Sequence, residues 1–145
     1  MAEMRVFTLE AVNALVPRLQ NVVGRQLQRR TAIEDLLIRL GRELGDVPER
    51  IVLDPADPTD VREMKRDLVA KIETYRAGWR EVEEMGAVLK DPRIGLLDFY
   101  GEVDGKLVWL CWKYGESECA FYHALEEGFS ARKAIGASVR QRLLN

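Results

Sequence analysis

The chain has 145 residues, of which 47% are hydrophobic and 32% are charged, and its formal net charge is −2. This length is typical of one domain, and the apolar content is too high for a wholly disordered chain. The nearly balanced charge argues against a dedicated nucleic-acid-binding protein, because affinity for phosphates needs a clustered excess of Lys and Arg. We therefore expect a single domain over residues 1–145 with no nucleic-acid partner.

The sequence also argues against a membrane protein. No run approaches the roughly 20 consecutive apolar residues of a spanning helix, and the first residues lack the apolar core of a signal peptide. We expect a cytoplasmic protein without a membrane partner. In that compartment Cys111 and Cys119 are expected to be reduced thiols, with a redox pair as the less favoured alternative.

A long helix is the first predicted element, over residues 8–45. Thr8 supplies a side-chain oxygen that can cap the first turn, and Gly45 supplies a stop. Between them apolar residues recur at alternating spacings of four and three, which predicts a narrow seam like that of a coiled coil. Pro17 lies within this pattern and predicts a bend near the start of the helix.

A second helix is predicted over residues 59–86, after a connection with three prolines, DVPERIVLDPADPTD. Asp57 or Thr59 can cap its first turn. Two long helices joined by one loop predict an antiparallel hairpin, and two helices alone cover each other's apolar seams incompletely.

Residues 94–135 are expected to form a head that contains a β-hairpin. The segment IGLLDFYGEVDGKLVWLCW has Asp104 and Gly105 at its centre, and this dipeptide favours a tight hairpin turn. Both faces of the second strand are apolar, and an isolated two-stranded hairpin is marginal in water. The hairpin is therefore expected to be covered on both sides or to join a larger sheet.

A short helix is predicted next, over residues 117–127. On such a helix a spacing of four residues places Cys119, His123 and Glu127 on one face, with Glu116 one turn back. Thiolate, imidazole and carboxylate are ligands of zinc and similar divalent ions, so these four residues are a predicted metal site. The alternative is structural, with Cys119 in the core and His123 hydrogen-bonded within the head.

Two further features of the head have open alternatives. Cys119 and His123 can form a nucleophile and base pair, although Cys119 fits the usual setting of an activated thiol only loosely. Asp98 lies in an apolar strand. We expect it either to face water at an edge or to pair with a buried cation such as Arg132 or Lys113.

Two segments of the chain match recognisable sequence patterns. FTLEAVNALVP is similar to the pattern F-T-x-E-x-A-N-x-L-x-P, and the segment from Gly95 to Arg132 is similar to G-x-x-D-F-P, L-C-W-x-x-G-E, W-H and G-F-x-x-R in turn. Together they resemble a family of short bacterial proteins catalogued only as a domain of unknown function. The chain departs from the pattern at Tyr100, Tyr122 and Val12, where the family has Pro, Trp and Ala. The resemblance implies membership and no particular reaction.

The resemblance also implies which residues of the head belong to the family's own pattern. They are Asp98, Phe99, Cys111, Trp112, Gly115, Glu116, His123, Gly128, Phe129 and Arg132. The polar members direct attention to a pocket in the head. We take Asp98, Trp112, Glu116, His123 and Arg132 as the candidate ligand-binding residues.

The sequence as a whole predicts an α+β protein, mainly α, with a long antiparallel helical hairpin, a C-terminal β-hairpin and a short helix. The incompletely covered seams and the two-sided β-hairpin predict a homodimer. The expected function is a non-enzymatic interaction or small-ligand-binding module with its site in the head. The alternative is a metal-dependent or Cys/His-assisted enzyme that uses His123, Glu116, Asp98 and Cys119.

Overall fold

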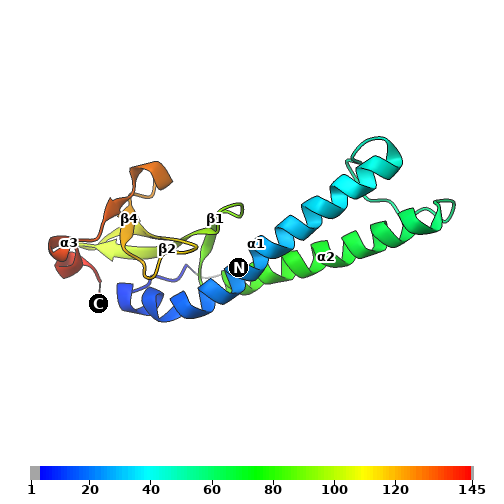
Figure 1. The fold of residues 1–145 in the computed structure, drawn as a ribbon. Coiled ribbons are helices and arrows are strands. Elements are labelled where there is room, and N and C mark those ends of the chain that lie inside the picture. Colours follow the sequence, from blue (N-terminus) through cyan, green and yellow to red (C-terminus); the bar gives the residue numbers. More distant parts are fainter. Residues whose placement is uncertain (1–3, 145) are drawn as a thin grey trace.

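The computed structural model describes residues 4–144 and shows a helical arm that extends from a β-sheet head (Figure 1). Helix α1 spans Leu9–Leu44, and helix α2, Thr59–Glu84, returns alongside it. Both predicted helices are confirmed to within two residues at each end. No helix among the described residues is long and apolar enough to cross a membrane.

The ends of α1 are formed by the residues that the sequence indicated. Thr8 Oγ1 accepts a hydrogen bond from the N–H of Ala11 at 3.0 Å, and Gly45 ends the helix with a φ of 88°. Pro17 lies inside α1 without interrupting it. The predicted cap of α2 is wrong, because Pro58 precedes its first residue and no side chain caps it. Asp57 instead pairs with Lys65 at 2.6 Å.

The helices of the arm meet in a small apolar cluster. Leu36 and Leu40 of α1 pack there with Val61 and Leu68 of α2. Nearer the head Gln26 interrupts the seam, and its amide donates to the carbonyl of Tyr75 at 2.6 Å. This buried amide is tolerated because it is hydrogen-bonded.

The head is one antiparallel sheet of five strands in the order β1-β2-β3-β4-β5. These strands are β1 Val88–Asp91, β2 Leu96–Val103, β3 Lys106–Lys113, β4 Phe121–His123 and β5 Lys133–Ala134. The predicted turn joins β2 to β3, with φ of 53° at Asp104 and 77° at Gly105. The hairpin therefore joins a larger sheet, as expected.

The inner face of the sheet packs on the N-terminal half of α1, which lies along it in Figure 1. Leu97, Phe99, Leu110 and Trp112 point to this side and form the main core with apolar residues of α1 such as Val12. Both predicted helices and the predicted hairpin thus contribute to one core, and α2 joins it through its last turns.

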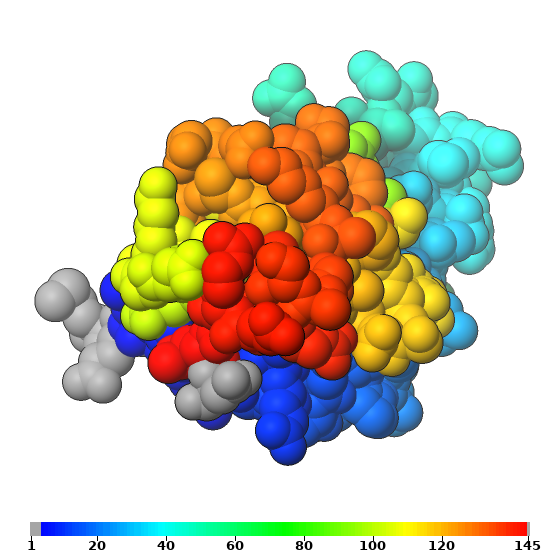
Figure 2. All heavy atoms as spheres, turned by 90° about the vertical axis from the view of Figure 1, so that its left-hand side faces the viewer, coloured from blue at the N-terminus to red at the C-terminus, as the bar shows by residue number. Residues whose placement is uncertain are grey.

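The outer face of the sheet is covered by the segment 124–132, which includes a short 3-10 helix at Phe129–Ala131. The indole N–H of Trp109 donates to the carbonyl of Leu125 at 3.3 Å, and the Arg132 guanidinium lies 3.9 Å from the ring centroid of Phe121. Figure 2 shows this part of the chain as orange atoms at the surface of the head. Both sides of the hairpin are therefore covered within one chain.

The helix predicted over residues 117–127 is wrong. Residues 121–123 form β4, and the short helix lies later in the chain, at α3, Ala137–Arg142. The preceding turn is held to α1: Gln20 Nε2 donates to the carbonyl of Glu116 at 2.8 Å, and the N–H of Cys119 donates to Asn13 Oδ1 at 2.6 Å. These bonds to α1 fix the turn through residues that are distant in the sequence, so tertiary structure overrides the local helical pattern.

Candidate functional site

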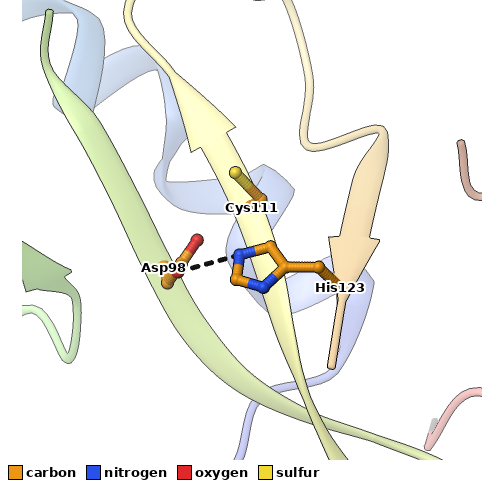
Figure 3. Close-up of side chains that lie close together, drawn as sticks. All are labelled: Asp98, Cys111 and His123. Carbon is orange, nitrogen blue, oxygen red and sulfur yellow. Dashed lines mark hydrogen bonds and ion pairs between the residues drawn. The ribbon is translucent and has the colours of Figure 1, made fainter. Parts of the chain in front are cut away.

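Three polar side chains from adjacent strands meet on the outer face of the sheet. Asp98 of β2 is directly opposite Cys111 of β3, and His123 of β4 is opposite Trp109, two residues from Cys111. Because side chains alternate along a strand, all three project to the same side. A carboxylate oxygen, the sulfur and a ring nitrogen lie within 4.8 Å of one another. We call Asp98, Cys111 and His123 the outer-face cluster (Figure 3).

The cluster is buried, with exposed fractions of 1% for Asp98, 0% for Cys111 and 3% for His123. Among residues 4–144 it is the one group of three or more His, Cys, Asp or Glu side chains whose ligand atoms gather in this way. A carboxyl group such as that of Asp98 is rarely fully buried unless it is paired or binds a cation.

Both nitrogens of His123 have defined neighbours. Nδ1 lies 3.0 Å from the carbonyl oxygen of Ala124, and Nε2 lies 3.0 Å from Oδ2 of Asp98. A carbonyl oxygen accepts hydrogen bonds and cannot donate them, so Nδ1 carries a proton. The ring therefore presents Nε2 to Asp98 in a fixed orientation.

The second carboxylate oxygen of Asp98, Oδ1, is buried and has no hydrogen-bond partner among residues 4–144. Burial raises the pKa of this carboxyl group, and the interactions with His123 and Cys111 offset only part of that effect. Asp98 was expected to face water or to pair with Arg132 or Lys113. Its partner is His123. His123 lies beside Asp98 because residues 121–123 form the strand β4 and not the predicted helix.

Both cysteines are free, buried thiols, as expected. Burial raises the pKa of Cys111 to about 12, and the nearby Asp98 carboxylate contributes to the rise. Burial likewise raises the pKa of Cys119 to about 12. Cys119 belongs to the core on the inner side of the sheet, whereas His123 projects from the outer side. The structure does not bring them together as a nucleophile and base pair.

Glu116 and Arg132 form a second polar pair beside the outer-face cluster. Arg132 donates two hydrogen bonds to the Glu116 carboxylate, at 3.0 and 2.8 Å. Its guanidinium also lies between two aromatic rings, 3.9 Å from the centroid of Phe121 and 4.4 Å from that of Phe129. The same guanidinium approaches Cys111 Sγ at 3.9 Å. Arg132 thus connects this pair to the cluster.

Four of the five candidate ligand-binding residues converge on the outer face: Asp98 with His123, and Glu116 with Arg132. Trp112 does not. Its ring is fully buried on the inner face, and its indole N–H donates to the carbonyl of Glu116 at 2.9 Å. Trp112 therefore supports the turn that carries Glu116 and contacts no other candidate.

The metal set predicted from the sequence does not assemble, because it depended on the missing helix. Glu116 is engaged by Arg132, and Cys119 lies in the inner core. Glu127 is exposed and accepts a hydrogen bond from the N–H of Ala124 at 3.3 Å. Of the four residues, His123 alone belongs to the outer-face cluster.

Cys111 is the member of the cluster that the sequence reasoning missed, since it was named in the resembling motif but not among the candidate site residues. A signal was present: the turn at Asp104 and Gly105 pairs Val103 with Lys106, and counting back along both strands places Asp98 opposite Cys111. The sequence contains no comparable indication that His123 joins the cluster, because its strand β4 has only three residues.

Trp109 closes one end of the cluster. Trp109 is opposite His123 on the neighbouring strand. The centroid of its ring lies 4.2 Å from that of Tyr100 and 4.2 Å from Lys90 Nζ. Its indole N–H holds the carbonyl of Leu125. Tyr100, which stands where the resembling motif has Pro, contacts Trp109 and so helps to hold the residues around Leu125 over the cluster.

A pocket of about 460 Å³ lies next to the cluster, where β4 ends at His123 and β3 begins at Lys106. Its lining includes Leu107, Leu125 and His123, with Lys106 and Lys133 among its charged residues. The pocket brings solvent to the end of the strand that carries His123.

Comparisons with known proteins identify a family. No curated protein and no solved structure matches the chain. A family model does match residues 5–135, a range that includes both segments with recognised motifs. The resemblance to a family of unknown function is therefore confirmed, and the chain belongs to the family described as uncharacterized conserved protein (DUF2203).

Proposed function

We propose that the protein is a small-ligand-binding module and that the outer-face cluster in the head is its binding site. The observation that carries this proposal is the Asp98 side chain, which is 2% exposed and has one carboxylate oxygen without a partner in the described part of the chain. A buried polar atom without a hydrogen bond costs about 1–3 kcal/mol of stability. Such an atom is explained most simply by a bound group that it contacts.

The cluster is a poor device for holding the fold together, which supports a binding role. The main core on the inner face consists of apolar side chains from both helices and the sheet. Buried polar pairs contribute little net stability compared with apolar residues of similar size. Buried titratable groups with shifted pKa values are instead typical of functional sites.

The buried thiols favour a binding module over a Cys/His-assisted enzyme. A nucleophilic cysteine needs a lowered pKa and access to its substrate. Cys111 and Cys119 are each 0% exposed, and burial raises each pKa to about 12.

The helical arm is the basis of the proposed homodimer. Both faces of the sheet are covered within one chain, so the head no longer supports dimerisation. The far end of the arm, by contrast, exposes large apolar side chains at Ile38, Leu44, Val47, Val52 and Leu53. Grouped apolar residues at one end of a molecule favour self-association.

The substitution Asp98→Asn tests whether the cluster is a site or a structural pair. An Asn side chain can donate from Nδ2 to His123 Nε2, so it fills the position without a charge. We expect the ligand-free variant to be at least as stable as the wild type in urea unfolding at neutral pH. Asp57→Asn, which breaks the Lys65–Asp57 pair of the arm, is the control and should lower stability.

A loss of roughly 3–5 kcal/mol in Asp98→Asn, the amount typical of breaking a buried pair, would contradict the proposal. The cluster would then be a structural element of the head.

A further inference from the structure

Two hydrogen-bond acceptors face each other in the outer-face cluster. The proton of a neutral His123 ring is on Nδ1, where it is donated to the carbonyl of Ala124, so Nε2 presents a lone pair. Oδ2 of Asp98 is 3.0 Å away, and an ionised carboxylate has only lone pairs to offer. Something positive must lie between the two atoms for this arrangement to be stable.

A proton and a metal ion are the two species that can fill this role. A shared proton satisfies Nε2 and Oδ2, but it leaves Oδ1 of Asp98 without a hydrogen-bond partner among residues 4–144 and does not engage the Cys111 sulfur. A metal ion engages the nitrogen, the carboxylate and the sulfur together. In tetrahedral zinc sites, with bonds of about 2.0–2.3 Å, ligand atoms are separated by roughly 3–4 Å. The separations in the cluster, all within 4.8 Å, are close to this range.

We propose that the ligand of the outer-face cluster is a divalent transition-metal ion, with zinc as the best match, bound by His123 Nε2, the Asp98 carboxylate and the Cys111 thiolate. This inference rests on the proposed function, since it names the ligand of the same site.

The donor types determine the class of metal. One imidazole, one thiolate and one carboxylate suit zinc and its neighbours in the first transition row. Magnesium and calcium prefer oxygen ligands throughout, and the cluster supplies only one oxygen-bearing side chain. The ionised carboxylate and thiolate together balance the two positive charges of the ion, so the filled site is neutral and suited to burial.

The surroundings of the cluster match those of a metal site. The hydrogen bond from Nδ1 of His123 to a backbone carbonyl is the usual way in which a metal-binding imidazole is oriented. Arg132 approaches the Cys111 sulfur at 3.9 Å and would stabilise a thiolate there. Its charge is compensated by the two hydrogen bonds to Glu116, so Arg132 does not repel a cation as a free guanidinium would.

Three protein ligands leave one position of a tetrahedral ion for water or for a further molecule. Structural zinc sites usually have four protein ligands. The proposed site is therefore of the kind that binds an additional ligand, and the pocket beside His123 is the neighbouring open space.

The test is zinc binding by the full chain after removal of bound metal with a chelator. We expect one equivalent of zinc by calorimetry for the wild type. Cys111→Ser, Asp98→Asn and His123→Gln should each weaken binding by more than about 100-fold, beyond the usual effect of changing a residue that only orients a ligand. Cys119→Ala is the matched control, because Cys119 is an equally buried thiol of the inner core that hydrogen-bonds to the backbone carbonyl of Cys111 at 3.4 Å and not to its thiol. This variant should bind zinc as the wild type does.

Cobalt(II) substitution provides a readout that does not depend on any variant folding. Cobalt bound to the wild type should give a thiolate-to-cobalt charge-transfer band and the strong visible bands of a tetrahedral ion. Absence of the charge-transfer band, or zinc affinity unchanged in Cys111→Ser, would overturn the metal proposal. If Asp98→Asn is stable while the wild type binds no metal, the metal assignment alone fails; if Asp98→Asn is severely destabilised, the binding site itself fails.

Discussion

Asp98 and Cys111 lie directly opposite each other on β2 and β3, and both side chains are buried on the outer face of the sheet. Their pairing follows from the two-residue turn at Asp104 and Gly105, whose positive φ angles set the register of the hairpin. A shift by one residue would move Asp98 into the apolar core on the inner face. The turn, six residues from Asp98, thus determines whether the cluster exists.

The first prediction concerns the pH dependence of stability in the metal-free protein. Burial raises the pKa of Asp98 in the folded state, so the folded protein retains this proton to higher pH than the unfolded chain does. The free energy of unfolding should therefore fall as pH rises from about 4 through the raised pKa. Urea unfolding at a series of pH values measures this slope, and Asp98→Asn should reduce it. An equal slope in the variant would show that Asp98 is not its source.

The second prediction concerns the two thiols. In the native protein without metal, Cys111 and Cys119 should react with iodoacetamide only as fast as the chain unfolds, because both are buried and their pKa values are raised to about 12. Their raised pKa values also predict a loss of stability as pH rises from about 9 towards 12. Mass spectrometry of the alkylated protein checks the first statement. Rapid alkylation of Cys111 in the folded state would contradict its placement.

The third prediction concerns the segment 124–132, which Arg132 holds over the sheet. Arg132→Ala removes two hydrogen bonds to Glu116 and the contacts with two aromatic rings, so we expect a loss of about 1–3 kcal/mol. Amide hydrogen exchange in the segment should increase. Arg142→Ala is the control, because its pair with Asp104 is exposed and should change stability by no more than about 0.5 kcal/mol. Equal effects of the two variants would argue against the role of Arg132.

The fourth prediction concerns the arm. Light scattering at micromolar concentration should give twice the chain mass of 16.6 kDa. Replacing Val52 and Leu53 together by Ser should shift the protein towards the monomer, because both side chains are more than half exposed within one chain. Leu144→Ser, an exposed apolar position of the head, should leave the mass unchanged. A monomeric wild type would end the dimer proposal.

The sequence was informative where local chemistry decides the structure. Thr8, Gly45 and the apolar seams define α1 and α2 largely by themselves, and the Asp104-Gly105 turn defines the β2–β3 hairpin. The strands β1, β4 and β5 were missed, because four, three and two residues are too few to show a strand pattern. Their formation depends on pairing with β2 and β3, which is a tertiary effect.

The candidate site was predictable only in part, because its residues were recognisable from motifs but their neighbours depend on strand pairing. The motifs that resemble the family directed attention to Asp98, Glu116, His123 and Arg132, and these residues form two neighbouring pairs, Asp98 with His123 and Glu116 with Arg132. The predicted neighbours of His123 were wrong, because the predicted helix placed His123 beside Cys119 and Glu127. Once β4 is a strand, His123 faces Asp98 and the thiol within reach is that of Cys111.

The most direct test of the metal site is the effect of zinc on the unfolding free energy of the wild type and of Cys111→Ser. A ligand present at 100 times its dissociation constant stabilises the folded state by about 2.7 kcal/mol. We predict a gain of this size in the wild type and in Cys119→Ala, and none in Cys111→Ser. An equal gain in all three proteins, or no gain in the wild type, would contradict the assignment of the outer-face cluster as a zinc site.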